Sequence, residues 1–171
     1  MAKKRVIKVR LSESSVQEAI KEIEAYKQEV IDKAKLLAKR LAEIGVGIAQ
    51  MEIGNYDAIF SGELQASMNL RAGDVLQYGS TYYVYTACPW AKYVEFGTGI
   101  VGARESNPLV DEQQISWTYD SHGHGDKGWH YFKDGEWHWT KGMPARPFML
   151  STSWDLQEKI VKIAKEVFTY G

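Results

Sequence analysis

The sequence predicts an α+β fold, in which a long N-terminal helix and a C-terminal helix pack on an antiparallel β-sheet. Helical periodicity runs from Val16 to Leu41, β-rich runs joined by turn residues follow, and helical periodicity returns at the end. The 171 residues are 44% hydrophobic, which is enough for one core. We therefore expect a single domain over residues 1–171, with residues 100–142 as an inserted loop and hairpin.

The N-terminal part combines a short strand with a long helix. Residues 7–11 alternate apolar and basic side chains, which predicts a half-buried strand with a basic outer face. Ser15 and Glu18 have the spacing of a capping box, and apolar residues then recur every three or four positions as far as Gly45. Thirty helical residues extend about 45 Å. Since a domain of this size needs less for its own core, we expect part of the helix to pack against another subunit.

The middle of the chain predicts an antiparallel meander. Glycines interrupt residues 45–62, so no regular element is predicted there. Three β-rich runs follow, and turn residues join them at 72–74 and 79–80. The runs are residues 66–70, 75–78 and 81–86.

The strongest local signal is a β-hairpin over residues 129–140, because Asp134-Gly135 at its centre is a preferred pair for a two-residue turn. The register then pairs Lys133 with Glu136, Phe132 with Trp137, Tyr131 with His138, and His130 with Trp139. Phe132, Trp137 and Trp139 share one face of this hairpin. That face is suited either to packing on a partner protein or to stacking on a sugar ring.

The chain ends in a predicted helix. Pro147 suits a first helical position, and an apolar side follows it. That side comprises Trp154, Val161, Ala164, Val167 and Phe168.

The four histidines are the best candidates for a metal site, because imidazole is a common ligand of zinc. They are His122, His124, His130 and His138. Strand alternation, however, places His130 and His138 on opposite faces of the hairpin, so they cannot converge on one ion. We therefore expect no metal and no cofactor. Cys88 has no histidine close in sequence and is expected to be a buried structural thiol.

Charge and missing motifs exclude several classes of protein. The formal net charge is -1, which argues against a generic polyanion binder. No window resembles a membrane span, and charges interrupt residues 6–10, where a secretory signal needs an apolar run. The sequence has no nucleophile elbow, phosphate loop, dinucleotide fingerprint or zincin motif, so we expect no enzyme.

Opposite charges are segregated along the chain. The first ten residues carry five basic side chains and no acidic one, whereas residues 105–136 carry seven acidic residues and two lysines. Contact between these segments on neighbouring copies would help to set their register. We therefore expect self-association that weakens as the salt concentration rises.

Four pieces, in order, resemble the tail-component, or head-to-tail joining (tail completion), family of long-tailed bacteriophages. They are Ser61-Gly62-Glu63-Leu64-Gln65-Ala66-Ser67-Met68, Trp90-Ala91-Lys92-Tyr93-Val94-Glu95-Phe96-Gly97-Thr98-Gly99, Met143-Pro144-Ala145-Arg146-Pro147-Phe148, and the closing amphipathic helix. The second and third pieces are the specific ones. Family members often have Asp-Thr-Gly-x-Leu where this chain has Phe60-Ser61-Gly62-Glu63-Leu64, so the acidic-Thr start is missing.

The resemblance implies a structural virion protein that forms a ring, expected to be hexameric, at the junction of tail and head. It implies no catalytic residue, no specific nucleic acid and no membrane; the partners are other copies and neighbouring tail-terminator, tail-tube or head-connector proteins. The protein would be assembled in the host cytoplasm and reside in the tail or neck. The residues implied at the assembly interface are Gly62, Leu64, Tyr93, Glu95, Phe96, Gly97, Thr98, Gly99, Pro144, Arg146, Pro147 and Phe148. The hairpin contact surface comprises Phe132, Trp137 and Trp139.

These motifs suggest local roles. Gly97 and Gly99 allow a sharp turn after a strand that carries Tyr93 and Val94. The carboxylate of Glu95 is a candidate partner for the guanidinium of Arg146. Pro144 and Pro147 restrict the direction in which the chain enters the last helix.

Two other functions remain open at this point. The Trp-rich hairpin suits a carbohydrate- or host-surface-binding module, and the histidines suit, more weakly, a metal-dependent hydrolase. Glycan binding that is lost on Trp137→Ala favours the first, and stoichiometric zinc with activity favours the second.

Overall fold

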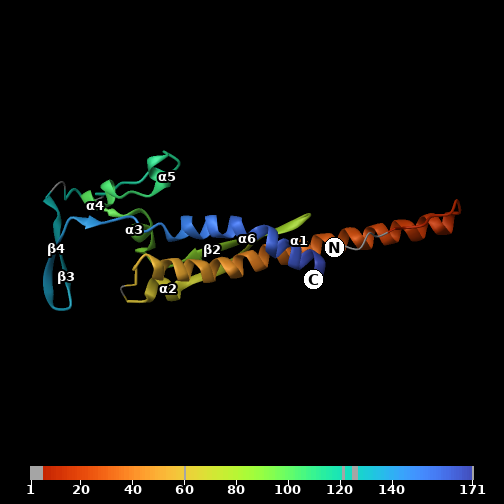
Figure 1. Ribbon diagram of the computed structural model, residues 1–171, viewed down its shortest axis with the longest axis horizontal. Coiled ribbons are helices and arrows are strands. Elements are labelled where there is room, and N and C mark those ends of the chain that lie inside the picture. The colour runs from red at the N-terminus through yellow and green to blue at the C-terminus, as the bar shows by residue number, and fades with distance from the viewer. Residues whose placement is uncertain (1–5, 60, 121, 125–126, 171) are drawn as a thin grey trace. The chain divides into compact units, whose positions relative to one another are not determined.

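The computed structural model describes residues 6–59, 61–120, 122–124 and 127–170, and it confirms the α+β class (Figure 1). The β-strands form two two-stranded antiparallel sheets, β1-β2 and β3-β4. In chain order, the elements are α1 (Glu13–Asn55), α2 (Glu63–Ser67), β1 (Met68–Leu76), β2 (Gly79–Thr86), α3 (Ala91–Phe96), α4 (Gly99–Arg104), α5 (Pro108–Asp111), β3 (Trp129–Lys133), β4 (Glu136–Thr140), β5 (Gly142–Met143) and α6 (Phe148–Tyr170).

The chain divides into two compact units. The first comprises the described parts of residues 1–45, 70–84 and 156–171, and the second those of residues 46–69 and 85–155. The single domain expected over residues 1–171 stays a prediction. No helix among the described residues is long and apolar enough to cross a membrane.

The strand predicted at residues 7–11 is wrong, because residues 6–10 have no regular secondary structure. α1 begins at Glu13 and is capped by Ser12 rather than Ser15. The Ser15 amide donates a hydrogen bond to Ser12 Oγ (3.4 Å), and Ser15 Oγ accepts one from the Arg10 amide (2.9 Å). The cap therefore lies three residues earlier than the capping-box spacing predicts. The basic residues 3–5 lie outside the described residues.

α1 does not end near Gly45 but continues to Asn55, where no element was predicted. Gly45 allows a close approach: a Cβ there would lie 3.0 Å from Val84 Cγ2 and 3.1 Å from Leu156 Cδ1. The glycine thus makes room for neighbouring side chains within the first unit, which outweighs its low helix propensity. In the second unit, Ile48, Ala49 and Ile53 are buried on the last turns of the same helix.

The β1-β2 ribbon differs from the predicted meander. The first predicted run is helical as far as Ser67, and β1 continues through the turn predicted at 72–74. The turn falls at residues 77–78 instead. Gly73 lies beneath the ring of Tyr83, since a Cβ at Gly73 would lie 2.5 Å from Tyr83 Cε2. The tyrosine ring covers the space that a side chain would fill, so this glycine belongs to a strand and not to a turn.

α6 begins at Phe148, one residue after Pro147, whose carbonyl accepts a hydrogen bond from the Ser151 amide (2.9 Å). The predicted apolar side is correct at Val167, which is fully buried, and wrong at Val161, which is 61% exposed. Trp154 and Phe168 are also exposed, and Ala164 is half-buried. In the first unit, the buried residues of α6 are Ile163 and Val167. They are four positions apart, so their side chains lie on one helix face.

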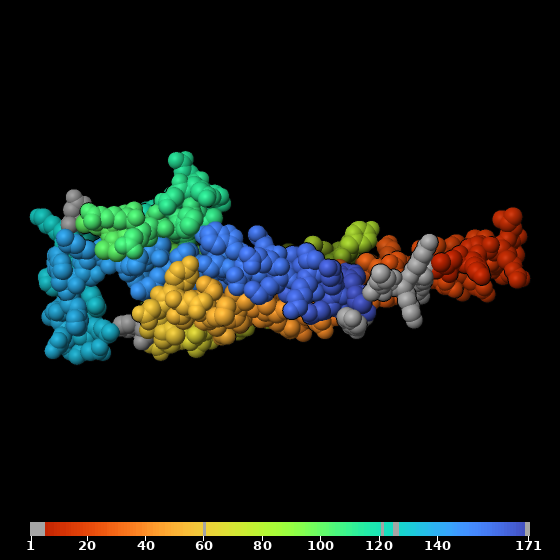
Figure 2. Space-filling model, in the orientation of Figure 1, coloured from red at the N-terminus to blue at the C-terminus, as the bar shows by residue number. Residues whose placement is uncertain are grey.

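The hairpin confirms its predicted turn and register. Lys133 pairs with Glu136, and the pairing continues through Phe132–Trp137, Tyr131–His138 and His130–Trp139. Asp134 and Gly135 both have positive φ, 53° and 87°, as a type I′ turn requires. In the space-filling view, residues 130–140, the light blue atoms at the left, lie at the surface of the second unit (Figure 2).

Candidate binding site formed by three sequence motifs

The segments of residues 90–99 and 143–148 lie side by side in the second unit. Met143 in β5 bridges to Thr98, and the Met143 amide donates a hydrogen bond to Thr98 Oγ1 (3.2 Å). The Arg146 amide donates a hydrogen bond to the Val94 carbonyl (2.8 Å). Two motifs separated by more than forty residues in the sequence therefore form one structural element.

Gly97 is required where these segments meet. Its φ is 77°, and a Cβ would lie 2.7 Å from the Ala145 nitrogen and 2.9 Å from the Met143 oxygen. The predicted sharp turn at Gly97 is confirmed, and Gly99 also has a positive φ, 61°. The strand predicted before the turn is wrong, because Tyr93 and Val94 lie in helix α3. Any other residue at position 97 would collide with backbone and occupy a strained conformation.

Glu95 does not pair with Arg146, contrary to the sequence-based hypothesis. Its side chain is only 6% exposed, and its oxygens lie at the start of α6. Oε2 accepts a hydrogen bond from the Met149 amide (2.8 Å), and Oε1 accepts one from the Leu150 amide (3.2 Å). The first turn of a helix has amides without helical partners and a positive dipole end, so a carboxylate is favoured there. Glu95 therefore caps a helix distant in sequence.

Asn107 completes this buried polar cluster and was missed by the sequence analysis. It is fully buried, and its Nδ2 donates hydrogen bonds to the Glu95 carbonyl (3.1 Å) and to Glu95 Oε1 (3.2 Å). Its Oδ1 accepts a hydrogen bond from the Leu109 amide (2.9 Å), which caps α5. The dipeptide Asn107-Pro108 is a signal for a helix start that could have identified this residue.

Burial raises the pKa of the Glu95 carboxyl above its ordinary value of 4.5. The hydrogen bonds from the Met149 and Leu150 amides and from Asn107 act in the opposite direction and are outweighed. The folded state therefore binds a proton at Glu95 more tightly than the unfolded chain does.

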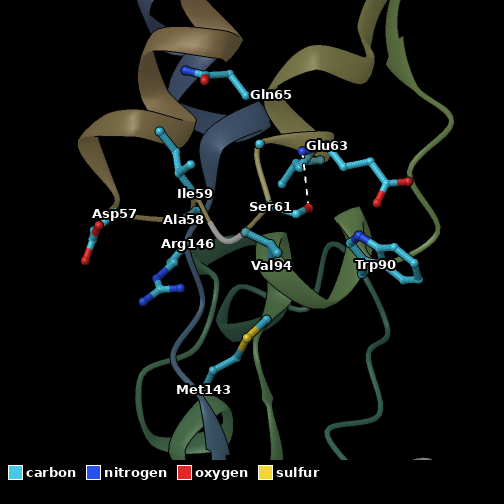
Figure 3. Close-up of a pocket in the computed structure, with 12 residues that line it drawn as sticks. Asp57, Ala58, Ile59, Ser61, Glu63, Gln65, Trp90, Val94, Met143 and Arg146 are labelled. Carbon is cyan, nitrogen blue, oxygen red and sulfur yellow. Dashed lines mark hydrogen bonds between the residues drawn. The ribbon is translucent and has the colours of Figure 1, made fainter. Parts of the chain in front are cut away.

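All three motifs line one pocket of about 760 Å³ (Figure 3). Most of its wall is apolar, and the guanidinium of Arg146 borders it. In this view, Trp90 and Arg146 lie on opposite sides of Val94. The first motif contributes Ser61, Gly62, Glu63, Leu64 and Gln65 to the lining. The second contributes Trp90 and Val94, and the third contributes Met143 and Arg146. Asp57, Ala58 and Ile59, which come just before the first motif in the sequence, also line the pocket. Phe60 lies outside the described residues. The volume is in the range of known ligand sites.

The remaining motif residues support this wall and do not line it. Tyr93 and Phe96 pack against the ring of Trp117, with centroids 5.8 Å and 5.1 Å away. Trp117 Nε1 donates a hydrogen bond to the Gly97 carbonyl (3.1 Å). Phe148 is 1% exposed and belongs to the core, and Pro144 and Pro147 flank Arg146 in the segment before it.

The hairpin aromatics form a separate surface in the same unit. Trp137 is 70% exposed, Phe132 is 60% exposed and Trp139 is 52% exposed. The rings of Phe132 and Trp137 contact each other at 5.4 Å, edge to face. These three residues therefore share an exposed aromatic face and do not line the pocket.

The histidines are divided between two places. His130 contacts Trp139 on one hairpin face and His138 contacts Tyr131 on the other, as the register predicts. His124 Nδ1 lies 3.1 Å from Asp120 Oδ1. Within the described parts of the chain, no three His, Cys, Asp or Glu side chains are grouped so as to hold a metal ion. Cys88 is buried, as expected for a structural thiol.

Comparisons with known proteins identify no relative: no family model matches the chain, and neither a curated protein nor a solved structure matches it.

Proposed function

We propose that this protein is a structural virion component, a tail-completion or head-to-tail connector subunit that forms a hexameric ring at the junction of a phage tail and head. The ring would contact neighbouring tail-terminator, tail-tube or head-connector proteins, and it would be assembled in the host cytoplasm. The proposal starts from the resemblance of three sequence motifs to the tail-completion family.

The observation that carries the proposal is an apolar stripe left exposed along the N-terminal half of α1. Ile20 is 49% exposed and Ile23 is 56% exposed, and Val16 and Val30 continue the same stripe. Their spacing of three, four and seven residues places these side chains on one helix face. A contiguous exposed apolar surface of this kind is typical of a protein–protein interface.

The arrangement of the motifs supports the same reading. Three segments that resemble the family converge on one apolar pocket, and a buried cluster around Glu95 ties two of them to the start of α6. Buried capping bonds of this kind make a rigid support, which suits residues that must present a surface to a neighbour.

The test is the mass of the protein in solution, measured by light scattering over a range of concentrations, with negative-stain imaging of any large species. The critical variant is Ile23→Asp, and its control is Ala25→Asp on the opposite side of the exposed helix. Both substitutions add one negative charge.

We expect the unmodified protein and Ala25→Asp to form rings, and Ile23→Asp to shift the mass toward the monomer. A protein that stays monomeric at millimolar concentration contradicts the proposal, and so does a ring that Ile23→Asp leaves unchanged in stability.

The second candidate is a carbohydrate- or host-surface-binding module, and the exposed aromatic face of the hairpin favours it. Aromatic rings on one flat, exposed face can stack on sugar rings. A monomeric protein whose glycan binding is lost on Trp137→Ala would support this function in place of the first.

A further inference from the structure

We infer that the exposed start of α1 in one copy packs, antiparallel, on an exposed face of the C-terminal half of α6 in the next copy. This inference rests on the proposed function and names the surface that would cover its apolar stripe. The evidence is the exposure, the spacing and the charge of two helix faces that both belong to the first unit.

The start of α1 is exposed all round. Every residue from 20 to 30 is exposed, so over three turns no side of the helix is buried against the described part of the chain. The apolar stripe is therefore not covered by α6 of the same chain. A helix segment without packing is only marginally stable in water, so we expect the surface of another molecule to cover it.

The C-terminal half of α6 has a second apolar face, which we call the α6 stripe. Val161 is 61% exposed and Phe168 is 39% exposed, and Ala164 lies between them at spacings of three and four residues. This stripe lies on a different side of the helix from Ile163 and Val167, which are buried. α6 therefore presents apolar side chains both to the core of the first unit and to solvent.

The spacings of the two stripes match when the helices run antiparallel. Along α1 the spacing is four and then three residues from Val16 through Ile20 to Ile23, and along α6 it is three and then four. Antiparallel helices therefore bring equal spacings together, which lets the side chains of one helix interdigitate with those of the other. Ile20 then lies opposite the small side chain of Ala164, and a larger apolar pair lies on each side of it.

Lys27 marks where the free part of the α1 stripe ends. It lies one turn beyond Ile23 on the same helix face, and its ammonium group is 5.4 Å from the centre of the Tyr78 ring of the same chain. The contact with another copy is therefore limited to the first three residues of the stripe.

Charge favours α6 of another copy over a second α1 as the partner. Residues 13–26 of α1 carry four acidic side chains and one lysine, so two such segments repel each other. Residues 159–165 of α6, by contrast, carry three lysines and no acidic residue. Lys162 and Lys165 are both exposed. Packing of α1 on α6 thus brings opposite charges together beside the apolar contact.

The two stripes are different surfaces of one chain, so their contact is head-to-tail. Each copy offers the start of α1 to one neighbour and the α6 stripe to the other, and such a contact generates either a closed ring or an open filament. Closure into a ring is the outcome that the proposed function needs.

The experiment uses the full-length chain and measures self-association by sedimentation velocity. Val161→Asp places a charge in the α6 stripe, and Thr169→Asp, at an exposed site on another side of the same helix, is its control. Ile23→Asp, with its control Ala25→Asp, does the same for α1. Circular dichroism and the melting temperature verify that each variant is folded.

We expect Val161→Asp and Ile23→Asp each to weaken association at least about tenfold, and the two controls to leave it unchanged. A mixture of Val161→Asp and Ile23→Asp should form a 1:1 dimer and nothing larger. The reason is that the intact α1 of the first variant fits the intact α6 of the second, whereas the other two surfaces are both altered.

A charge exchange tests the choice of partner helix. Replacing Lys162 and Lys165 together with glutamate should weaken association, because the α6 segment then repels the acidic start of α1. Adding Glu22→Lys and Glu24→Lys to the same chain should restore it. Failure of this restoration would count against the pairing of these two segments.

The inference is overturned if Val161→Asp associates like the unmodified protein or if the mixture forms no dimer. Rings that Ile23→Asp weakens and Val161→Asp does not would retain the proposed function and remove this contact, because the start of α1 would then pack on another surface. A protein that is monomeric at millimolar concentration overturns both. Association that obeys both variants but yields only open filaments in negative stain would support the contact and remove the ring.

Discussion

Replacing Glu95 with alanine tests whether this residue is the tertiary cap of α6. The carboxylate accepts hydrogen bonds from the Met149 amide (2.8 Å), the Leu150 amide (3.2 Å) and Asn107 Nδ2 (3.2 Å). Glu95→Ala leaves the Met149 and Leu150 amides without their acceptor, and Asn107 Nδ2 keeps only its hydrogen bond to the Glu95 carbonyl (3.1 Å). Because Asn107 is fully buried and Leu150 is 8% exposed, water cannot easily replace the carboxylate at these two positions.

The magnitude follows from those contacts. An unsatisfied buried donor costs about 1 to 3 kcal/mol, and loss of a cap costs about 1 kcal/mol. Removing a buried charge returns part of this cost, since burial raises the pKa of Glu95. We expect Glu95→Ala to lower the free energy of unfolding by about 2 to 4 kcal/mol. Glu95→Gln should lower it less, because glutamine keeps the volume and one acceptor oxygen.

The assay is urea unfolding followed by tryptophan fluorescence. All six tryptophans lie between residues 90 and 154, so the signal reports on the second unit, which contains Glu95. Glu105→Ala, at an exposed position of the same unit, is the matched control. A loss below about 0.5 kcal/mol, or one equal to that of the control, would refute the capping role.

Four further predictions follow from the same features. Because the pKa of Glu95 is raised, the stability that protonation of this carboxyl contributes is full below about pH 4.5 and is lost as the pH rises through the folded pKa. The urea midpoint should fall across that window, and Glu95→Gln should lack this slope. In thermal melts, Gly97→Ala should destabilise the second unit by more than Gly62→Ala does. Both glycines have a φ of 77°, but only at Gly97 would a Cβ collide with backbone atoms. Equal effects of the two substitutions would contradict the packing argument. Gly135→Ala should lower the near-ultraviolet circular dichroism of the hairpin tryptophans, because the type I′ turn needs its φ of 87°, and an unchanged spectrum would contradict this. If the basic first ten residues contact the acidic segment 105–136 of a neighbouring copy, light scattering should show weaker self-association at high salt. A mass independent of salt would count against this contact.

The local signals at the hairpin, at Gly97 and at Pro147 predicted the structure correctly, whereas the alternation at residues 7–11 and the capping-box spacing at Ser15 did not. Asp134-Gly135 selects a two-residue turn, and the alternation on each side then sets every pair of the hairpin. The turn at Gly97 and the start of α6 after Pro147 were predicted for the same reason, since glycine and proline restrict the backbone in place.

Predictions failed where a glycine served packing. Gly45 and Gly73 were interpreted as a helix end and a turn, yet the first lies inside α1 and the second inside β1. In each case, a side chain from a distant segment fills the space beside the glycine: Val84 and Leu156 in one, and Tyr83 in the other. The sequence shows that the residue is small, but it does not show which side chain packs against it in the fold.

The sequence by itself determined the α+β class and the turn and register of the hairpin. Only the tertiary structure decided how the three sequence motifs are held together. Composition and spacing suggested an ion pair between Glu95 and Arg146, whereas the fold brings the first turn of α6 against Glu95 and turns Arg146 to the pocket. A buried carboxylate accepts hydrogen bonds from the donors that the fold places near it. Helix amides are already fixed by the backbone, so they lose less conformational freedom in forming such a bond than a long arginine side chain does.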